Sequence, residues 1–268
     1  MQPLPHREHR AAFEALVTDA LNYAKSIGAT DAAAEVSEGQ GLSVGVRLGE
    51  IETVEQTRDR SLSVTVFAGQ RRGSASTSDF SRQALEQTVQ AAWHIAKYTA
   101  EDPAAGLPEE GDLLLTPSPD LSLYHPWDVS VEQAANMALE AEQAARSLDR
   151  RITNSEGAGV ESQEGQFVLG NTRGFLDGYH FTRHGLSVAP IAGRGDNMQR
   201  DFWYVSDRRA DRLADPASVG RYAAQRALAR LNARRLSTRQ VPVLFEAPLA
   251  LGLLGALTQA VSGGALYR

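Results

Sequence analysis

The strongest constraint on the fold is an alternation of apolar and polar residues that runs from Ala32 to Ser76. Side chains of a β-strand point in turn to its two faces, so a period of two indicates strands with one buried face. Turn-forming Gly, Asp and Arg residues bound the alternating stretches, and this arrangement predicts an antiparallel meander. The alternating apolar positions are Ala34/Val36, Leu42/Val44/Val46/Leu48, Ile51/Val54 and Leu62/Val64/Val66.

Two amphipathic helices are expected on either side of this meander. Residues 8–27 place their apolar side chains on one stripe, and Gly28 follows at the position that suits a helix end. Residues 80–99 carry a second apolar stripe, for which Ser78-Asp79 offers an N-cap. A helix, a meander and a helix together make one α+β unit.

A linker and a second unit follow. Residues 101–123 are rich in proline and glycine, which is typical of a connecting segment. Residues 130–148 have the spacing of a third helix, and Ser130 and Gln133 at its start fit a capping box.

The second unit continues with strands and a fourth helix. Residues 151–204 alternate in short pieces and are dense in glycine. Asp215 and Pro216 are suited to the N-cap and first helical position of a helix that runs to about Leu231. The predicted fold class is therefore α+β, with two helix–antiparallel-sheet units followed by the start of a third, C-terminal domain.

The third domain is predicted from the stretch Arg234 to Arg268. It predicts a short strand at Val241 to Phe245 and, after Pro248, an apolar helix that reaches Val261. A helix that is apolar nearly all round has to be buried, so we expect downstream chain or another subunit to cover it. The predicted domains are residues 1–105, a linker at 106–120, residues 121–232, and a truncated C-terminal domain at 233–268.

The amino-acid composition excludes several classes of protein and kinds of site. The chain is 42% hydrophobic and 22% charged, which is the balance of an ordinary globular protein. Its net charge of -6 argues against a general binder of nucleic acid or of anionic membranes. It contains no cysteine, which excludes disulfides and thiolate metal sites and fits a cytoplasmic protein. The longest apolar run, Leu249 to Ala256, is too short to cross a bilayer.

His180 and His184 have the spacing that binds zinc when two histidines lie on one helix turn. Their neighbours Tyr179, Phe181 and Leu186 instead indicate a strand, in which residues four apart are separated by about 13 Å. Two side chains at that distance do not close one metal site. A structural or surface role is favoured for both, and contact of a single histidine with a substrate, or with a metal ion held elsewhere, is the alternative.

The segment Met198 to Tyr204 places aromatic residues beside charge. Arg200, Trp203 and Tyr204 are candidates for contact with a peptide or a protein partner, and core packing is the structural alternative. The arginines that follow in the fourth helix and its exit fit a solvated or partner-facing surface better than a phosphate site. No nucleophile elbow, phosphate loop or HExxH-type motif occurs in the sequence.

Several segments resemble the TldD/PmbA family, and its PmbA (TldE) branch more closely than its TldD branch. They are Met198–Tyr204, Asn154–Gly157 with Thr172–Gly178, and above all Ala233–Arg268. The resemblance implies a subunit of a cytoplasmic metallopeptidase complex that processes or degrades unfolded peptides, including modified-peptide precursors and an antitoxin. A TldD-like subunit is the implied partner, and a homo-oligomer is a further expectation.

The resemblance also implies where the metal belongs. In the TldD branch, the helix that matches Ala250–Val261 carries an HExxxH motif, which would bind a divalent metal ion, expected to be zinc. The matching stretch here, Gly252–Gly264, contains no His, Glu, Asp or Cys. We therefore expect no catalytic residue, no metal ligand and no cofactor in this chain, and a metal in the TldD-like partner. Two alternatives stay open: a non-catalytic binding protein that modulates a target such as DNA gyrase, and an independent metalloenzyme using His180 or His184.

Overall fold

The computed structural model describes residues 6–113 and 119–267. It divides into two units, Met1–Leu231 and Asn232–Arg268. Helices of the first unit are α1 (His6–Ser26), α2 (Arg82–Tyr98), α3 (Val131–Ser147) and α4 (Pro216–Ala229), with short 3-10 turns at η1 (Glu110–Asp112), η2 (Gly195–Asn197) and η3 (Ala210–Arg212). Its strands are β1 (Asp31–Arg47), β2 (Glu50–Ala68), β3 (Arg71–Thr77), β4 (Ile152–Asn171), β5 (Leu176–Asp177), β6 (His180–Ala192), β7 (Gln199–Arg200) and β8 (Trp203–Asp207).

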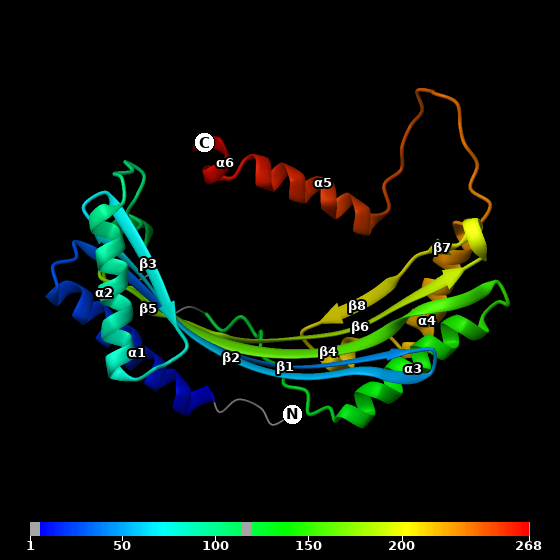
Figure 1. Ribbon diagram of the computed structural model, residues 1–268, viewed down its shortest axis with the longest axis horizontal. Coiled ribbons are helices and arrows are strands. Elements are labelled where there is room, and N and C mark those ends of the chain that lie inside the picture. Colours follow the sequence, from blue (N-terminus) through cyan, green and yellow to red (C-terminus); the bar gives the residue numbers. More distant parts are fainter. Residues whose placement is uncertain (1–5, 114–118, 268) are drawn as a thin grey trace. The chain divides into compact units, whose positions relative to one another are not determined.

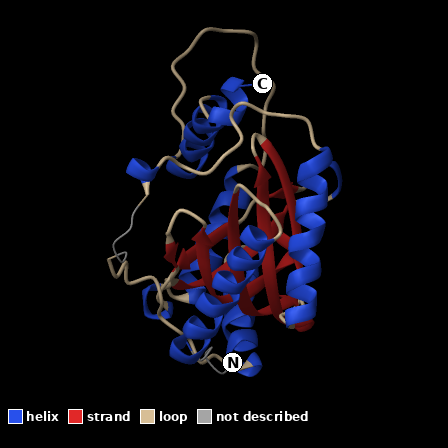
Figure 2. Cartoon of the chain, turned by 90° about the vertical axis from the view of Figure 1, so that its left-hand side faces the viewer, coloured by secondary structure: helices blue, strands red, loops and turns tan. Residues whose placement is uncertain are grey.

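All of these strands belong to one antiparallel sheet. Its order is β3-β2-β1-β4-β6-β7, with β5 paired to β4 and β8 paired to β6. The sheet is strongly curved, and the helices α1, α2, α3 and α4 of the same unit lie on its convex side (Figure 1). Figure 2 shows these helices against the strands from another direction. The α+β class is therefore confirmed, and the pairing of β1 with β4 joins strands from both halves of the chain.

The meander has fewer and longer strands than the alternation predicted. The four alternating stretches lie on only two strands, β1 and β2, which pair continuously from Asp31↔Phe67 to Arg47↔Glu50 with one bulge at Gly45/Val46. The predicted breaks near residues 37–41 and 55–61 are wrong. Polar residues interrupt the apolar pattern there, but the backbone stays extended because each strand keeps a hydrogen-bonded neighbour.

Two separate apolar cores lie between the sheet and its helices. The first packs α1 and α2 against Val36 of β1, Val64 of β2 and Val168 of β4. The second packs α3 and α4 against Val44 of β1 and Val160 of β4. Even-numbered residues of β1 and β4 face the helices in both cores, so odd-numbered residues of these strands face the concave side.

Most of the predicted helix ends are confirmed. Gly28 follows α1 with φ +99, a conformation that glycine adopts without steric cost. Ser130 and Gln133 form the predicted capping box of α3, and Asp215 caps α4. The N-cap of α2 is Ser81 rather than Ser78-Asp79, because the Asp79 carboxylate accepts a hydrogen bond from the Ser81 backbone N–H in the turn before the helix.

The second unit contains α5 (Ala247–Ala260) and α6 (Gly263–Tyr267). The apolar helix is thus confirmed, but the strand predicted at Val241 to Phe245 is wrong. Residues 232–267 include no second strand with which such a segment could pair, and an isolated strand leaves its backbone groups unpaired. The α5 side chains are not buried: Leu251, Leu254 and Leu257 are 60–64% exposed.

Part of the predicted linker, residues 114–118 of 106–120, lies outside the described residues. None of the described helices combines the length with the apolar character that crossing a lipid bilayer requires.

Candidate functional site

The concave face of the sheet is lined by small and polar side chains. On β1 the positions facing this side are Ser37, Gly39, Gly41, Ser43 and Gly45. Neighbouring side chains lie close to the glycines of this face, and a Cβ added at Gly45 would be 2.5 Å from the Thr53 hydroxyl oxygen. The Phe181 ring, for example, lies so close to the Gly165 backbone that an added Cβ would be 2.8 Å away. Within the described residues of the first unit, both apolar clusters lie on the helix side of the sheet and neither lies on the concave face.

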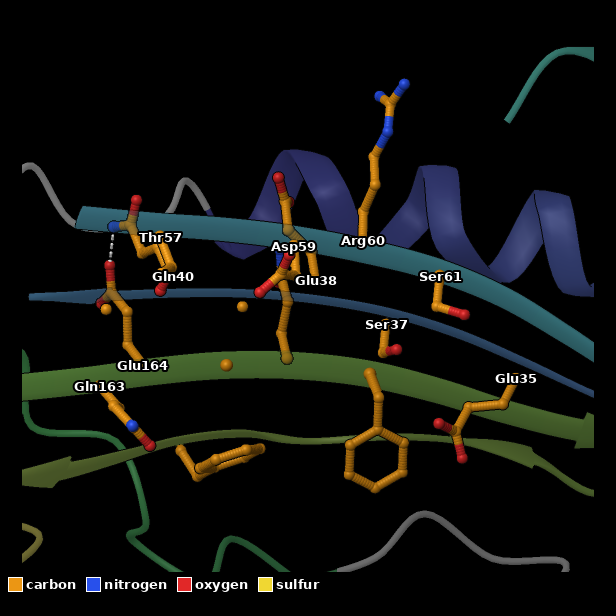
Figure 3. Close-up of a pocket in the computed structure, with 16 residues that line it drawn as sticks. Glu35, Ser37, Glu38, Gln40, Thr57, Asp59, Arg60, Ser61, Gln163 and Glu164 are labelled. Atoms are coloured by element: carbon orange, nitrogen blue, oxygen red, sulfur yellow. Dashed lines mark hydrogen bonds between the residues drawn. The ribbon is translucent and has the colours of Figure 1, made fainter. Parts of the chain in front are cut away.

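A hollow of about 590 Å³ lies on this face at the middle of β1, β2 and β4. Phe167 and Phe181 give it apolar walls, and Glu35 and Asp59 contribute carboxylates. Figure 3 shows its lining residues spread along adjacent strands, with a hydrogen bond from the Gln40 amide to the Glu164 carboxylate joining β1 to β4. The polar lining residues include Ser37, Thr57, Ser61 and Gln163.

Acidic side chains flank the middle of the concave face. Glu55 on β2 and Glu161 on β4 are both opposite Ser43 of the intervening strand β1, so they flank the same row. Both are exposed, as are Asp59 and, on β6, Arg183. This surface therefore favours extended, positively charged or neutral chains over acidic ones.

A second hollow, of about 380 Å³, lies toward the β8 end of the concave face. Ala189 and Phe202 supply apolar side chains to its lining. Arg200 also lines it and forms an ion pair with Glu156, with Nη1 and Oε2 2.7 Å apart. Arg200 is 60% exposed at its side chain, so it remains accessible to solvent.

The predicted histidines lie on the helix side of the sheet, on strand β6 as expected. His184 is buried, with Nδ1 3.0 Å from Ser162 Oγ and Nε2 3.0 Å from the His125 carbonyl oxygen. His180 is exposed, and its ring packs edge-on against Tyr124 with centroids 4.4 Å apart. Both histidines therefore contact the segment that connects the two halves of the chain.

That connecting segment crosses the sheet between the two apolar cores. Tyr124 donates a hydrogen bond from its hydroxyl to Glu164 Oε2 at 3.0 Å, and Thr182 receives one from the His125 backbone N–H at 2.9 Å. Burial, together with the neighbouring Glu164 carboxylate, raises the pKa of Tyr124 far above its ordinary value. The phenol therefore stays protonated and keeps donating to Glu164 at neutral pH.

The three candidate contact residues of the aromatic segment, Arg200, Trp203 and Tyr204, lie on opposite sides of the sheet. Trp203 points to the helix side, where its ring packs on Tyr222 with centroids 4.7 Å apart and lies under the Arg226 guanidinium at 5.2 Å. Tyr204 is 49% exposed and stacks on Phe202. Arg200 and Phe202 line the hollow at the β8 end. The five candidate residues therefore do not form one site.

The described residues also contain no grouping of three or more His, Asp or Glu side chains placed to hold a metal ion. On α5, Thr258 donates its hydroxyl to the Leu254 carbonyl oxygen at 2.8 Å, and the helix carries no carboxylate or imidazole. The side chains of α5 therefore do not fit a metal ion.

The sequence matches two consecutive family models. Residues 32–96 match PmbA/TldA metallopeptidase domain 1, and residues 124–231 match the PmbA/TldA metallopeptidase central domain. The chain belongs to the PmbA/TldD family, on its PmbA branch.

Individual relatives agree with this assignment. The chain is 46% identical over 261 residues to Metalloprotease PmbA of Escherichia coli O157:H7, covering 97% of this chain and 57% of that protein. It is 44% identical over 252 residues to the Metalloprotease PmbA homolog of Haemophilus influenzae, covering 94% of this chain and 55% of that protein. This PmbA-branch chain thus spans somewhat more than half the length of these curated relatives.

Solved structures share the fold. A Bacteroides thetaiotaomicron protein described as a candidate modulator of DNA gyrase superposes with a TM-score of 0.87 at 23% identity, covering 94% of this chain and 58% of that one. TldE from Thermococcus kodakarensis superposes with a TM-score of 0.66 at 15% identity, covering 80% and 47%.

The concave face is a candidate functional surface that sequence-based prediction missed. Its signal is present in the odd-numbered residues of β1, all of which are serine or glycine from residue 37 to residue 45. The alternation predicts these residues only as the exposed side of a meander. Curvature makes that side a concave surface, and strand alternation alone does not reveal curvature.

Proposed function

We propose that this chain is the PmbA/TldE-like subunit of a cytoplasmic TldD–PmbA metallopeptidase complex that processes or degrades unfolded peptides. In this proposal a TldD-like partner supplies the divalent metal ion, expected to be zinc, and the hydrolytic chemistry. This chain supplies a surface that holds peptide. A cysteine-free sequence agrees with a reducing, cytoplasmic location.

The observation that carries the proposal is the chemistry of α5. Family resemblance aligns this helix with the metal-binding helix of the TldD branch, and here Gly252–Gly264 offers only hydrocarbon, hydroxyl and amide side chains. Zinc in proteins is held by imidazole, thiolate or carboxylate groups. A member of a metallopeptidase family with this helix is therefore best suited to a non-catalytic role.

The concave face supports the peptide-holding role. An unfolded peptide needs a long surface without a competing apolar core, and the small residues Ser37, Gly39 and Gly41 line the hollow at the middle of the concave face. Its two hollows, of about 590 and 380 Å³, offer space for side chains along one extended path. Phe181 and Phe202 contribute apolar contacts in them.

The first test is complex formation. This chain is mixed with a purified TldD-like protein and analysed by size-exclusion chromatography with light scattering, and hydrolysis of an unfolded peptide is measured for each protein and for the mixture. We expect a stable hetero-oligomer and chelator-sensitive hydrolysis only when the partner is present. Absence of a complex, or chelator-sensitive hydrolysis by this chain alone, contradicts the proposal.

A second candidate function is the modulation of DNA gyrase without proteolysis. It is favoured by a solved relative of the same fold, which is described as a candidate gyrase modulator. A pull-down of purified gyrase by this chain, with no TldD-like protein present, separates the two. Retention of gyrase at stoichiometric level, together with failure to bind the partner, would support the second function over the first.

A further inference from the structure

The two apolar cores leave the middle of the sheet between them. Figure 1 shows α1 and α2 at one end of the curved sheet and α3 and α4 at the other. On β1, Val36 belongs to the first core and Leu42 to the second. The helix-facing residues between them, Glu38 and Gln40, are polar. Close-packed apolar side chains resist any change in the spacing of the elements they join, so the middle of the sheet is restrained less than its ends.

Glu38 and Gln40 belong to a polar strip that continues across two further strands. β4 contributes Ser162 and Glu164, β6 contributes Thr182 and His184, and all four of these side chains are buried. The net contribution of a hydrogen bond to stability is small, because water can replace either partner. Contacts made by the polar strip can therefore be broken and remade more readily than those of the two apolar cores.

Residues 121–129 of the connecting segment lie over the polar strip and are bonded to both β4 and β6. Tyr124 donates its hydroxyl to Glu164 Oε2 of β4 at 3.0 Å. The Thr182 backbone N–H of β6 donates to the Leu123 carbonyl oxygen at 2.9 Å. This part of the connecting segment is thus held on the middle of the sheet by hydrogen bonds to two adjacent strands.

The bound conformation of the segment contains a strained residue. Ser122 has a φ of 48, a left-handed conformation that costs energy for a residue with a side chain. Its carbonyl oxygen lies 2.9 Å from His125 Nε2 within the same turn. Trp127 and Val129, by contrast, pack in the second core. Residues 122–125 can therefore detach while the rest of the segment stays anchored.

On the concave face, two paired glycines mark the same level of the sheet. Gly39 of β1 is directly opposite Gly165 of β4. Glycine inside a strand has no side chain that packs on its neighbours, and it often marks a bend. Both glycines also line the hollow of about 590 Å³ whose strands Figure 3 shows. A change in bending at this pair therefore changes the width of that hollow.

We propose that the sheet bends at the Gly39–Gly165 pair and that residues 122–125 are a latch that holds one degree of bending. While the latch is bound, it fixes β4 and β6 at the middle of the sheet. When it detaches, the two ends of the sheet move relative to each other with their helices, and the width of the hollow varies. The inference goes beyond the proposed function, since the motion belongs to this chain alone and requires neither a partner nor a metal ion.

Hydrogen exchange tests the latch. In Tyr124→Phe the hydroxyl that bonds to Glu164 is removed, so exchange of the His125 and Thr182 amides, which both bond across the latch, should be about tenfold faster. Tyr23→Phe is the matched control, because the Tyr23 hydroxyl accepts a hydrogen bond from Gln90 inside the first half. Thermal unfolding checks that both variants are folded. Unchanged exchange of the two amides in folded Tyr124→Phe overturns the latch.

A distance measurement tests the bending. The chain contains no cysteine, so Ala91→Cys on α2 and Glu140→Cys on α3 provide the two sites for nitroxide labels. Pulsed electron paramagnetic resonance measures the distribution of distances between them. We expect a broader distribution in the Tyr124→Phe background than in the parent or Tyr23→Phe background. The same distribution in all three shows that the two ends do not move, and it overturns the proposal.

Two glycine variants locate the bend. Gly39→Ala, added to the labelled Tyr124→Phe protein, should narrow the distribution, because the new Cβ lies at an ordinary 3.5 Å from the Glu164 carbonyl oxygen and restricts only the backbone. Gly159→Ala is the matched control, since its Cβ is also 3.5 Å from a carbonyl oxygen, that of Val44, outside the polar strip. Narrowing by neither variant, or by both equally, refutes a bend at Gly39.

These measurements are independent of the test of the proposed function. They use neither a TldD-like protein nor a peptide, so a rigid sheet refutes only the inference. Failure to form a complex with the TldD-like partner refutes only the proposed function.

Discussion

At the scale of single residues, buried polar side chains hold segments that are distant in sequence. Glu142 of α3 is 1% exposed, and its two carboxylate oxygens each accept a backbone hydrogen bond at 2.8 Å, from Leu48 and from Gly49. These two residues form the β1–β2 turn with φ values of 54 and 90. A helix of the second half thereby anchors a hairpin of the first.

Glu142→Gln should destabilise the fold. The amide NH2 cannot accept a hydrogen bond, so one of the two turn N–H groups loses its partner inside the protein, at a cost of about 2 kcal/mol. The free energy of unfolding in urea measures the change. Glu140→Gln, at an exposed position of the same helix, is the matched control and should be nearly neutral. Equal stability of the two variants would contradict the anchoring role of Glu142.

The phenol of Tyr124 should ionise at a higher pH than the phenols of the other tyrosines. Its pKa is raised by burial and by the Glu164 carboxylate, so it lies above the unfolded value of about 10. The hydrogen bond to Glu164 is then fully present below pH 10 and is lost as the pH rises through the folded pKa. Comparison of ultraviolet difference titrations of the parent protein and of Tyr124→Phe checks this. If the parent protein develops more phenolate absorbance below pH 10 than Tyr124→Phe does, Tyr124 ionises in its ordinary range and the prediction is wrong.

At the scale of elements, close approaches of backbone decide how the helices pack. Gly220 of α4 lies against α3, where an added Cβ would be 2.0 Å from the Ala141 carbonyl oxygen. Glycine at an interior position normally makes a helix about 1 kcal/mol less stable than alanine does. Here the contact between α3 and α4 requires it, because a methyl group would have to displace backbone.

Gly220→Ala should therefore destabilise the first unit by about 1–3 kcal/mol, opposite in sign to the effect of helix propensity. Gly252→Ala is the matched control, because Gly252 is also helical but has no atom within 4 Å of an added Cβ. Urea unfolding followed by circular dichroism compares the two. A stabilised Gly220→Ala variant would show that α3 and α4 are farther apart than described.

At the scale of the whole molecule, one sheet unites the two halves of the first unit. β1 belongs to the first half and β4 to the second, and they pair from Ala33↔Asn171 to Val46↔Ala158. Each strand also contributes residues to both apolar cores, for example Val36 and Val44 on β1. The halves consequently share their central strands.

We expect residues 6–231 to unfold in one cooperative transition. Neither core can lose its sheet without exposing the other, so the slowest-exchanging amides of α2 and of α4 should report the same free energy of opening. Hydrogen exchange followed by mass spectrometry through a denaturant series measures both. Two well-separated transitions would show that the halves are independent domains.

Sequence alone determined the local structure and the family of this protein. Amphipathic spacing predicted the helices, and the residues at Ser130, Gln133 and Asp215 predicted their ends, because these signals act within a few neighbouring residues. The segments around Met198–Tyr204 and Ala233–Arg268 were sufficient for the family resemblance. Alternation identified strands but misplaced breaks in β1 and β2, since polar residues inside a strand resemble a turn.

Only the tertiary structure decided which faces and edges are available. His184 faces the connecting segment, Trp203 faces α4, and Tyr204 faces the concave side, although the last two are neighbours in sequence. These placements follow from strand pairing between residues more than a hundred positions apart and from the curvature of the sheet. Both arise from the packing of the complete first unit, and no local sequence pattern encodes them.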